Sequence, residues 1–75
     1  MSPHEFLSTA VESSVLTSVA YYGTDQTLQL QFRTGAVYRY FAVPPTVFRA
    51  LLTAESKGAY FNRSIRNRFR YQRLV

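Results

Sequence analysis

The chain has 75 residues, no cysteine and a formal net charge of +5. A chain this short supports one small domain, which excludes a two-domain enzyme. Its 47% hydrophobic and 16% aromatic content provides enough large side chains for a packed core, which excludes disorder over the whole chain. Without cysteine there is neither a disulfide framework nor a thiolate metal site, and a reducing cytoplasm is the expected setting.

No apolar run approaches the roughly eighteen residues of a membrane span, and the first ten residues lack the composition of a signal peptide. We therefore expect a soluble protein with no membrane partner. Residues 1–10 also lack a clean periodicity and are predicted as a loose N-terminal arm, with at most one helical turn between Pro3 and Thr9. The remainder, 11–75, is predicted as a single domain.

Two consecutive segments have the composition of β-strands. Residues 15–22 are rich in β-branched and aromatic side chains and precede the turn sequence Gly23-Thr24-Asp25. Residues 27–33 alternate strictly between apolar and polar side chains, which is typical of a half-buried strand. We interpret them as the first two strands of an antiparallel meander.

A third strand is predicted over 36–42, and the length of the loop before it decides where the Tyr38-Arg39-Tyr40 motif points. A two-residue loop would place both tyrosines beside glutamines and force Arg39 among the leucines of the preceding strand. A three-residue loop, with Gly35 in the left-handed bulge position, keeps Arg39 off the leucine face, and we favour it for that reason. The pairs that it predicts are Phe32 with Ala36, Leu30 with Tyr38, and Leu28 with Tyr40.

Val43-Pro44-Pro45 ends the third strand, because proline cannot donate to a sheet and is well placed to open a helix. Apolar residues at helical spacing predict an amphipathic helix over 46–55. Ser56-Lys57-Gly58 is predicted to stop this helix, with Gly58 in the left-handed conformation. A second, short helix is predicted over 59–66.

The last residues, 68–75, alternate aromatic side chains with arginine and are predicted as extended chain that can form an edge strand. The predicted fold class is α+β, with a three-stranded antiparallel meander followed by an amphipathic helix, a second short helix and this C-terminal edge strand. The core is predicted to contain Leu28, Leu30, Phe32, Val47, Phe48, Leu51, Leu52, Phe61 and Ile65.

Positive charge is concentrated at the C-terminal end, where no acidic residue follows Glu55. Such a pole attracts polyanions, and arginine suits flat, bidentate contacts with phosphate. Interleaved aromatic rings can stack on bases. We nevertheless expect Phe69 and Tyr71 to dock on the core, because a small domain can spare few aromatic residues. The candidate nucleic-acid-binding residues of this segment are Lys57, Arg63, Arg66, Arg68, Arg70, Tyr71 and Arg73.

Tyr38 and Tyr40 allow two interpretations, a stacking platform for single-stranded RNA or core rings packed beneath the helix. The three-residue loop favours the core interpretation and places Arg39 on the opposite face, where it could extend a basic surface. Val37 and Phe41 share that opposite face, and their partial exposure raises a homodimer as an alternative.

Catalysis is poorly supported, because the chain holds one histidine, no cysteine and four acidic residues. The ligand count also argues against a metal site, and the three glycines form no phosphate-binding loop. We expect no enzyme activity and no cofactor.

Taken in order, the scattered motifs of this chain resemble those of the KTSC domain family. That family is named for an extension at the C-terminus of some lysyl-tRNA synthetases, and it also occurs as small free-standing bacterial proteins. The similarity runs from about Val11 to Leu74. The motifs are Ser13-Ser14, the Leu28-Leu30-Phe32 alternation, Gly35, Tyr38-Arg39-Tyr40, Val43-Pro44, Ser56-Lys57-Gly58, Phe61-Asn62, Ile65 and Tyr71-Gln72-Arg73-Leu74.

The resemblance implies RNA binding, suggested by attachment of the domain to a synthetase. Two hypotheses follow. The first is a cytoplasmic, non-catalytic accessory module that binds nucleic acid, RNA rather than DNA, through the C-terminal arginines. The alternative is a protein-interaction module, or a homodimer, whose arginines meet an acidic partner.

Overall fold

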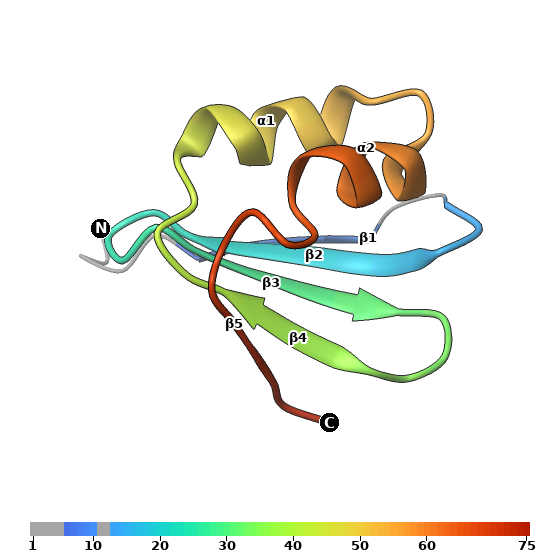
Figure 1. The fold of residues 1–75 in the computed structure, drawn as a ribbon, viewed down its shortest axis with the longest axis horizontal. Helices are drawn as coiled ribbons and strands as arrows, with labels where there is room; N and C mark the ends of the chain where they lie inside the picture. Colours follow the sequence, from blue (N-terminus) through green and yellow to red (C-terminus); the bar gives the residue numbers. More distant parts are fainter. Residues whose placement is uncertain (1–5, 11–12) are drawn as a thin grey trace.

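The computed structural model describes the backbone of residues 6–10 and the whole of residues 13–75. Within these residues one antiparallel sheet is formed by five strands that follow the order of the chain. Two helices cover one face of this sheet, and among the described residues the other face carries no helix (Figure 1). The strands are β1 Phe6–Ala10, β2 Leu16–Tyr22, β3 Thr27–Phe32, β4 Val37–Tyr40 and β5 Tyr71–Arg73, and the helices are α1 Pro45–Thr53 and α2 Lys57–Ser64.

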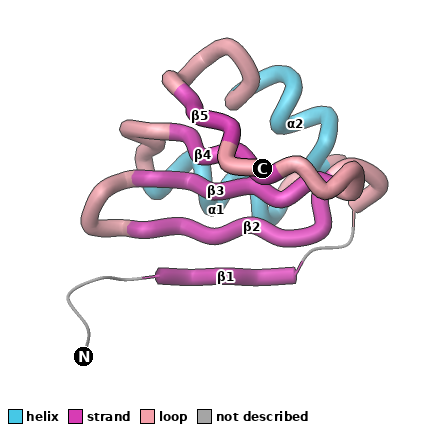
Figure 2. Tube along the Cα trace, turned by 90° about the horizontal axis from the view of Figure 1, so that it is seen from below, coloured by secondary structure: helices cyan, strands magenta, loops and turns pink. Residues whose placement is uncertain are grey.

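The strand β1 pairs along its length with β2, from Phe6 opposite Tyr22 to Ala10 opposite Ser18. The prediction of a loose arm or helical turn is therefore wrong for Phe6–Ala10, while residues 1–5 lie outside the described residues. The stabilising hydrogen bonds come from β2, a partner that the local sequence does not reveal. Figure 2 shows β1 beside β2 at one edge of the sheet and β5 beside β4 at the other.

The hairpin between β3 and β4 has the three-residue loop that the sequence favours. Leu28 lies opposite Tyr40 and Leu30 opposite Tyr38, and the Phe32 amide donates to the Ala36 carbonyl at 2.9 Å. Gly35 has a φ of +96°, which an L side chain rarely adopts. The predicted register is thus confirmed, and with it the separation of Arg39 from the leucine face.

Helix α1 begins at Pro45, because a proline at the first helical position loses no intrahelical hydrogen bond. It buries Phe48 and Leu51 against the sheet, and the Phe48 ring stacks on Tyr21 with centroids 4.7 Å apart. The Tyr21 hydroxyl donates to the Val43 carbonyl at 2.5 Å, which secures the segment that leads into the helix.

Helix α2 begins where the sequence predicts a stop. Ser56 is its N-cap, and its hydroxyl oxygen accepts a hydrogen bond from the Ala59 amide at 3.2 Å. Gly58 lies inside the helix rather than beyond the end of another, so the predicted left-handed stop is wrong. A Cβ at this position would lie 2.7 Å from the Val15 Cγ2 atom, so the glycine permits close packing of α2 on the start of β2.

The core lies between the sheet and the two helices. Of the nine predicted core residues, Phe32, Val47 and Leu52 are partly buried and pack against the core, and the others are buried. Tyr40 is also buried, which supports the core interpretation for this ring. The buried cluster contains Leu16, Val19, Tyr21, Leu28, Leu30, Tyr40, Val43, Phe48, Leu51, Phe61 and Ile65.

After α2 the chain turns back towards the sheet through Asn67, whose φ is +65°. It then pairs with β4 as the predicted edge strand β5, with Tyr71 opposite Tyr40 and Arg73 opposite Tyr38. Because directly paired residues share a face of the sheet, Tyr71 and Arg73 lie on the same side as the two tyrosines of β4.

Candidate nucleic-acid interface

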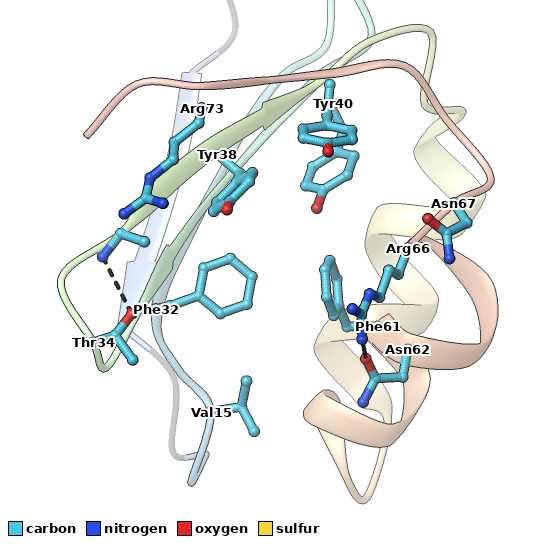
Figure 3. Close-up of a pocket in the computed structure, with 12 residues that line it drawn as sticks. Val15, Phe32, Thr34, Tyr38, Tyr40, Phe61, Asn62, Arg66, Asn67 and Arg73 are labelled. Atoms are coloured by element: carbon cyan, nitrogen blue, oxygen red, sulfur yellow. Dashed lines mark hydrogen bonds between the residues drawn. The ribbon is translucent and has the colours of Figure 1, made fainter.

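A cavity of about 480 Å³ lies between α2 and the strands β4 and β5. Side chains from the sheet and from α2 face each other across it (Figure 3). Its position depends on β5, because that strand adds Tyr71 and Arg73 to the face of the sheet that α2 covers. The lining residues are Val15, Phe32, Thr34, Ala36, Tyr38, Tyr40, Phe61, Asn62, Arg66, Asn67, Tyr71 and Arg73.

Three tyrosine rings form one wall of the cavity. The Tyr71 centroid lies 5.6 Å from that of Tyr38 and 5.6 Å from that of Tyr40. Accessibility increases across the group, since Tyr40 is 3% exposed, Tyr38 is half-buried and Tyr71 is 57% exposed. The two less accessible rings therefore support Tyr71, whose exposed face can meet a ligand.

Two phenylalanines connect this wall to α2. Phe32 makes edge contacts with Tyr38 and with Phe61, at centroid distances of 5.6 and 5.3 Å. Phe61 in turn lies edge-on to Tyr40 at 5.8 Å. Such edge-to-face packing restricts the orientation of each ring, so the aromatic surface is held in place before any ligand arrives.

The α2 side of the cavity carries polar groups. Asn62 and Arg66 lie one turn apart on α2 and its C-terminal extension, and the Arg66 Nη1 atom donates to the Asn62 Oδ1 atom at 3.4 Å. Both side chains are exposed. This bond leaves the Asn62 amide hydrogens and the remaining Arg66 donors available to a ligand.

Arg73 lies on the sheet side, with its guanidinium over the Tyr38 ring at 5.7 Å. Its Nε atom donates to the Val75 main-chain oxygen at 2.9 Å. The cation–π contact and this hydrogen bond hold a positive charge beside the tyrosines.

A shallower hollow adjoins the cavity and shares Tyr71 and Asn67 with it. Arg68 and Arg70 line this hollow, and the Arg70 guanidinium lies over the Phe41 ring at 5.8 Å. The Phe41 amide donates to the Arg70 carbonyl at 2.9 Å, which fixes this part of the C-terminal segment on the end of β4. The two hollows together bring four arginines to one aromatic surface.

We call this surface the arginine–tyrosine surface. It unites seven of the ten residues predicted from the sequence, and all of them line one of the two hollows. Its members are Tyr38, Tyr40, Arg66, Arg68, Arg70, Tyr71 and Arg73.

Three predicted residues lie elsewhere. Arg39 points to the opposite face of the sheet, where its Nη2 atom donates to the Gln29 Oε1 atom at 3.0 Å. Lys57 donates to the Ala54 carbonyl at 3.2 Å at the start of α2. Arg63 lies over the Tyr60 ring at 5.5 Å and lines neither hollow.

The structure corrects one further expectation and adds residues that the sequence did not single out for a site. Phe69 packs against the core as expected, but Tyr71 does not, because it stands on the outer strand. Phe32, Asn62 and Asn67 line the cavity although none was a predicted binding residue. The sequence pattern indicates Phe32 as a core residue. It gives no indication of a binding role for Asn62 or Asn67, apart from the presence of Asn62 in the Phe61-Asn62 motif.

Burial, followed by the neighbouring Tyr38 and Tyr71, raises the pKa of Tyr40 to about 12, against a smaller lowering effect of Arg66. Tyr40 thus keeps its proton at neutral pH. Its role at the surface is to support the other rings, since only a small part of it is exposed.

Within residues 6–10 and 13–75, no group of three or more His, Cys, Asp or Glu residues is arranged to hold a metal ion. In the same part of the chain, no helix combines the length and apolar character required to cross a membrane.

The fold and the arginine–tyrosine surface together define a small α+β domain with a five-stranded antiparallel sheet, two helices on one face and an aromatic cavity at one edge. The family model of the KTSC domain matches residues 12–69. The chain therefore belongs to the KTSC domain family, which confirms the resemblance noted in the sequence.

Relatives are of two kinds. An uncharacterised protein from Stutzerimonas stutzeri is 46% identical over 66 residues, which cover 87% of this chain and 93% of that protein. A lysine–tRNA ligase from Nostoc punctiforme is 43% identical over 63 residues, which cover 84% of this chain and 11% of the ligase. The chain thus spans about a tenth of the length of such ligases.

The crystal structure of a KTSC domain protein from Yersinia pestis has the same fold. It superposes with a TM-score of 0.90 and 28% sequence identity, and the match covers 95% of this chain and 100% of that one. The predicted α+β class is confirmed by this likeness.

Proposed function

We propose that this chain is a non-catalytic, cytoplasmic module that binds single-stranded nucleic acid, RNA in preference to DNA, through the arginine–tyrosine surface. The observation that carries the proposal is the convergence of Arg66, Arg68, Arg70 and Arg73 around the exposed ring of Tyr71. Arginines supply contacts to phosphates, and aromatic faces supply sequence-tolerant stacking on bases.

The charge balance supports the same function. No acidic residue follows Glu55, so the arginines of the C-terminal segment have no acidic side chain among their sequence neighbours. The guanidinium groups of Arg66, Arg68 and Arg70 can therefore meet a phosphate without first giving up a neighbouring acidic side chain, whereas Arg73 would exchange its bond to the Val75 main-chain oxygen. The electrostatic part of such binding is independent of sequence and decreases with salt.

The preference for RNA rests on the relatives. Proteins that contain a matching segment are named lysine–tRNA ligases, and that name describes enzymes acting on an RNA. We propose that the KTSC domain of this chain likewise meets RNA. Equal-length oligo(U) and oligo(dT) provide a direct comparison, and we expect tighter binding to oligo(U).

The test is the salt dependence of oligonucleotide binding, measured by fluorescence anisotropy. If four or five phosphates are contacted, the logarithm of affinity should fall against the logarithm of salt concentration with a slope of about −3. Replacing Arg66, Arg68 and Arg70 by alanine should flatten the slope by about 2, as expected for three lost phosphate contacts. Tyr71→Ala should weaken binding without changing the slope.

Arg49 provides a matched control, since it is exposed on α1, away from both hollows. Arg49→Ala and Arg70→Ala remove the same charge, but only Arg70→Ala should reduce the slope. Equal effects would show that net charge alone attracts the nucleic acid. Absence of salt-sensitive binding would reject the proposal and favour a protein-interaction module, with the face containing Val37 and Phe41 as the first surface to examine.

A further inference from the structure

The cavity differs from a simple electrostatic surface because it has aromatic walls and a polar edge. Its sheet side presents Tyr38, and its helix side presents Asn62 and Arg66 (Figure 3). Tyr71 also lines the cavity, from β5. A volume of about 480 Å³ lies within the usual range of roughly 300–1,000 Å³ for pockets that hold small organic ligands. A planar group can therefore lie among the rings while its edge reaches the polar side chains.

We propose that this cavity binds one unstacked nucleobase of the bound strand, with guanine preferred over adenine. This inference rests on the proposed function, because the base arrives as part of a strand whose phosphates contact the arginines. The exposed ring of Tyr71 provides the stacking surface, and the rings of Tyr38 and Tyr40 hold it in place.

The preference for guanine follows from the paired donors of the Arg66 guanidinium at the polar edge. Arg66 offers donors and no acceptor, and its Nη1 atom also donates to the Asn62 oxygen, which keeps a second lone pair. The discrimination between bases therefore rests on Arg66. Guanine presents two neighbouring acceptors, O6 and N7, whereas adenine places an amino donor beside N7. The paired donors of Arg66 can bind O6 and N7 of guanine together, whereas adenine offers them only the one acceptor N7.

Arg73 places a phosphate-binding group beside the same cavity. Its guanidinium lies 5.7 Å from the Tyr38 ring centroid, at the sheet side of the cavity. A nucleotide whose base lies on Tyr71 has its phosphate one sugar away from that base, on the side where Arg73 lies. The site thus combines a base position and a phosphate position in one nucleotide-sized space.

The experiment compares three oligonucleotides of equal length, oligo(G) kept short enough to remain single-stranded, oligo(A), and an abasic strand with the same phosphates. The proposal predicts tightest binding to oligo(G) and weakest binding to the abasic strand. Tyr71→Ala should weaken oligo(G) binding by about 5- to 150-fold and leave the abasic strand unaffected. Tyr71→Phe retains the ring and should restore binding.

Tyr60→Ala is the matched control, because Tyr60 is a partly buried tyrosine on α2 that lines neither hollow and also carries an arginine over its ring. This variant should leave all three affinities unchanged. Arg66→Lys should reduce the preference for guanine, because lysine cannot form the paired contacts of a guanidinium with O6 and N7. Chemical shifts of the Asn62 side-chain amide should move with GMP and not with ribose 5-phosphate.

Equal salt-dependent binding of oligo(G) and the abasic strand would overturn the base pocket while leaving the proposed function standing. Equal losses from Tyr60→Ala and Tyr71→Ala would overturn it as well. Oligo(A) binding as tight as oligo(G) would reject the guanine preference. Absence of binding to every strand would instead reject the proposed function, and the base pocket with it.

Discussion

Gly58 of α2 lies so close to Val15 that a Cβ at position 58 would be 2.7 Å from the Val15 Cγ2 atom and 3.2 Å from its Cβ. Real Cβ atoms essentially never make a contact as short as 2.7 Å, so a side chain at position 58 requires Val15 or α2 to shift. The same helix provides Asn62 and Phe61 to the cavity, and the separation of α2 from the sheet therefore sets the width of the candidate site.

The first prediction concerns this contact. Gly58→Ala should lower the free energy of unfolding. Overpacking costs about 1–3 kcal/mol, and the better helix propensity of alanine offsets about 1 kcal/mol of that cost. Urea unfolding followed by circular dichroism measures the change. The double variant Gly58→Ala/Val15→Ala should be more stable than Val15→Ala alone, because the clashing Val15 Cγ2 atom is absent. If the effects of the two substitutions on the free energy of unfolding simply add, the contact is contradicted.

The second prediction concerns the β3–β4 hairpin. Gly35→Val should destabilise the domain by about 1 kcal/mol or more, because a β-branched side chain is strained at a φ of +96°. No atom lies within 4 Å of the added Cβ, so the cost comes from the backbone and not from a clash. Thr34→Asn in the same loop should change stability little, since asparagine is favoured in turns. Equal stability of both variants would argue against the left-handed bulge.

The third prediction concerns the core. Leu30 and Leu51 are fully buried on opposite sides of the sheet–helix interface. Replacing either residue by alanine should lower the free energy of unfolding by about 2–5 kcal/mol, which is much of the stability of a domain this small. Leu74→Ala is the matched control, since Leu74 is 39% exposed and its replacement should be nearly neutral. Similar melting temperatures for all three variants would contradict the described core.

The fourth prediction concerns alkaline pH. The pKa of Tyr40 is raised to about 12 in the folded chain, chiefly by burial, from about 10 in the unfolded chain. Between these values the folded state holds a proton that the unfolded state releases, so the free energy of unfolding is retained below pH 10 and falls as pH rises towards 12. The free energy of unfolding of the Tyr40→Phe variant should fall less steeply over that pH range, as measured by urea unfolding at successive pH values. Parallel curves for the two proteins would contradict the shift.

Much of the fold follows from local patterns. The strict alternation before Arg33, together with Gly35, predicted the register that pairs Leu30 with Tyr38, because only one loop length keeps an arginine off the leucine face. Pro45 and the spacing of Phe48 and Leu51 predicted the first helix. In each case the determining interaction lies within a few residues along the chain, where sequence carries the information directly.

Where the prediction was wrong, the deciding contact came from a distant segment. Phe6–Ala10 is a strand because β2 supplies its hydrogen-bonding partners. Gly58 resembles a helix stop in isolation, and it is a helical residue because Val15 leaves no room for a side chain. A turn sequence and a close-packing sequence can both require glycine, and the local pattern does not distinguish them.

For the candidate site, the sequence by itself determined the chemistry: arginines without acidic neighbours, interleaved with aromatic rings. The tertiary structure decided which of these residues meet. It placed Tyr71 and Arg73 beside Tyr38 through the β4–β5 pairing, whereas the position of Arg39 on the opposite face already followed from the predicted hairpin loop. The physical reason is that side chains alternate across a strand, so the register between strands more than thirty residues apart selects the members of the site.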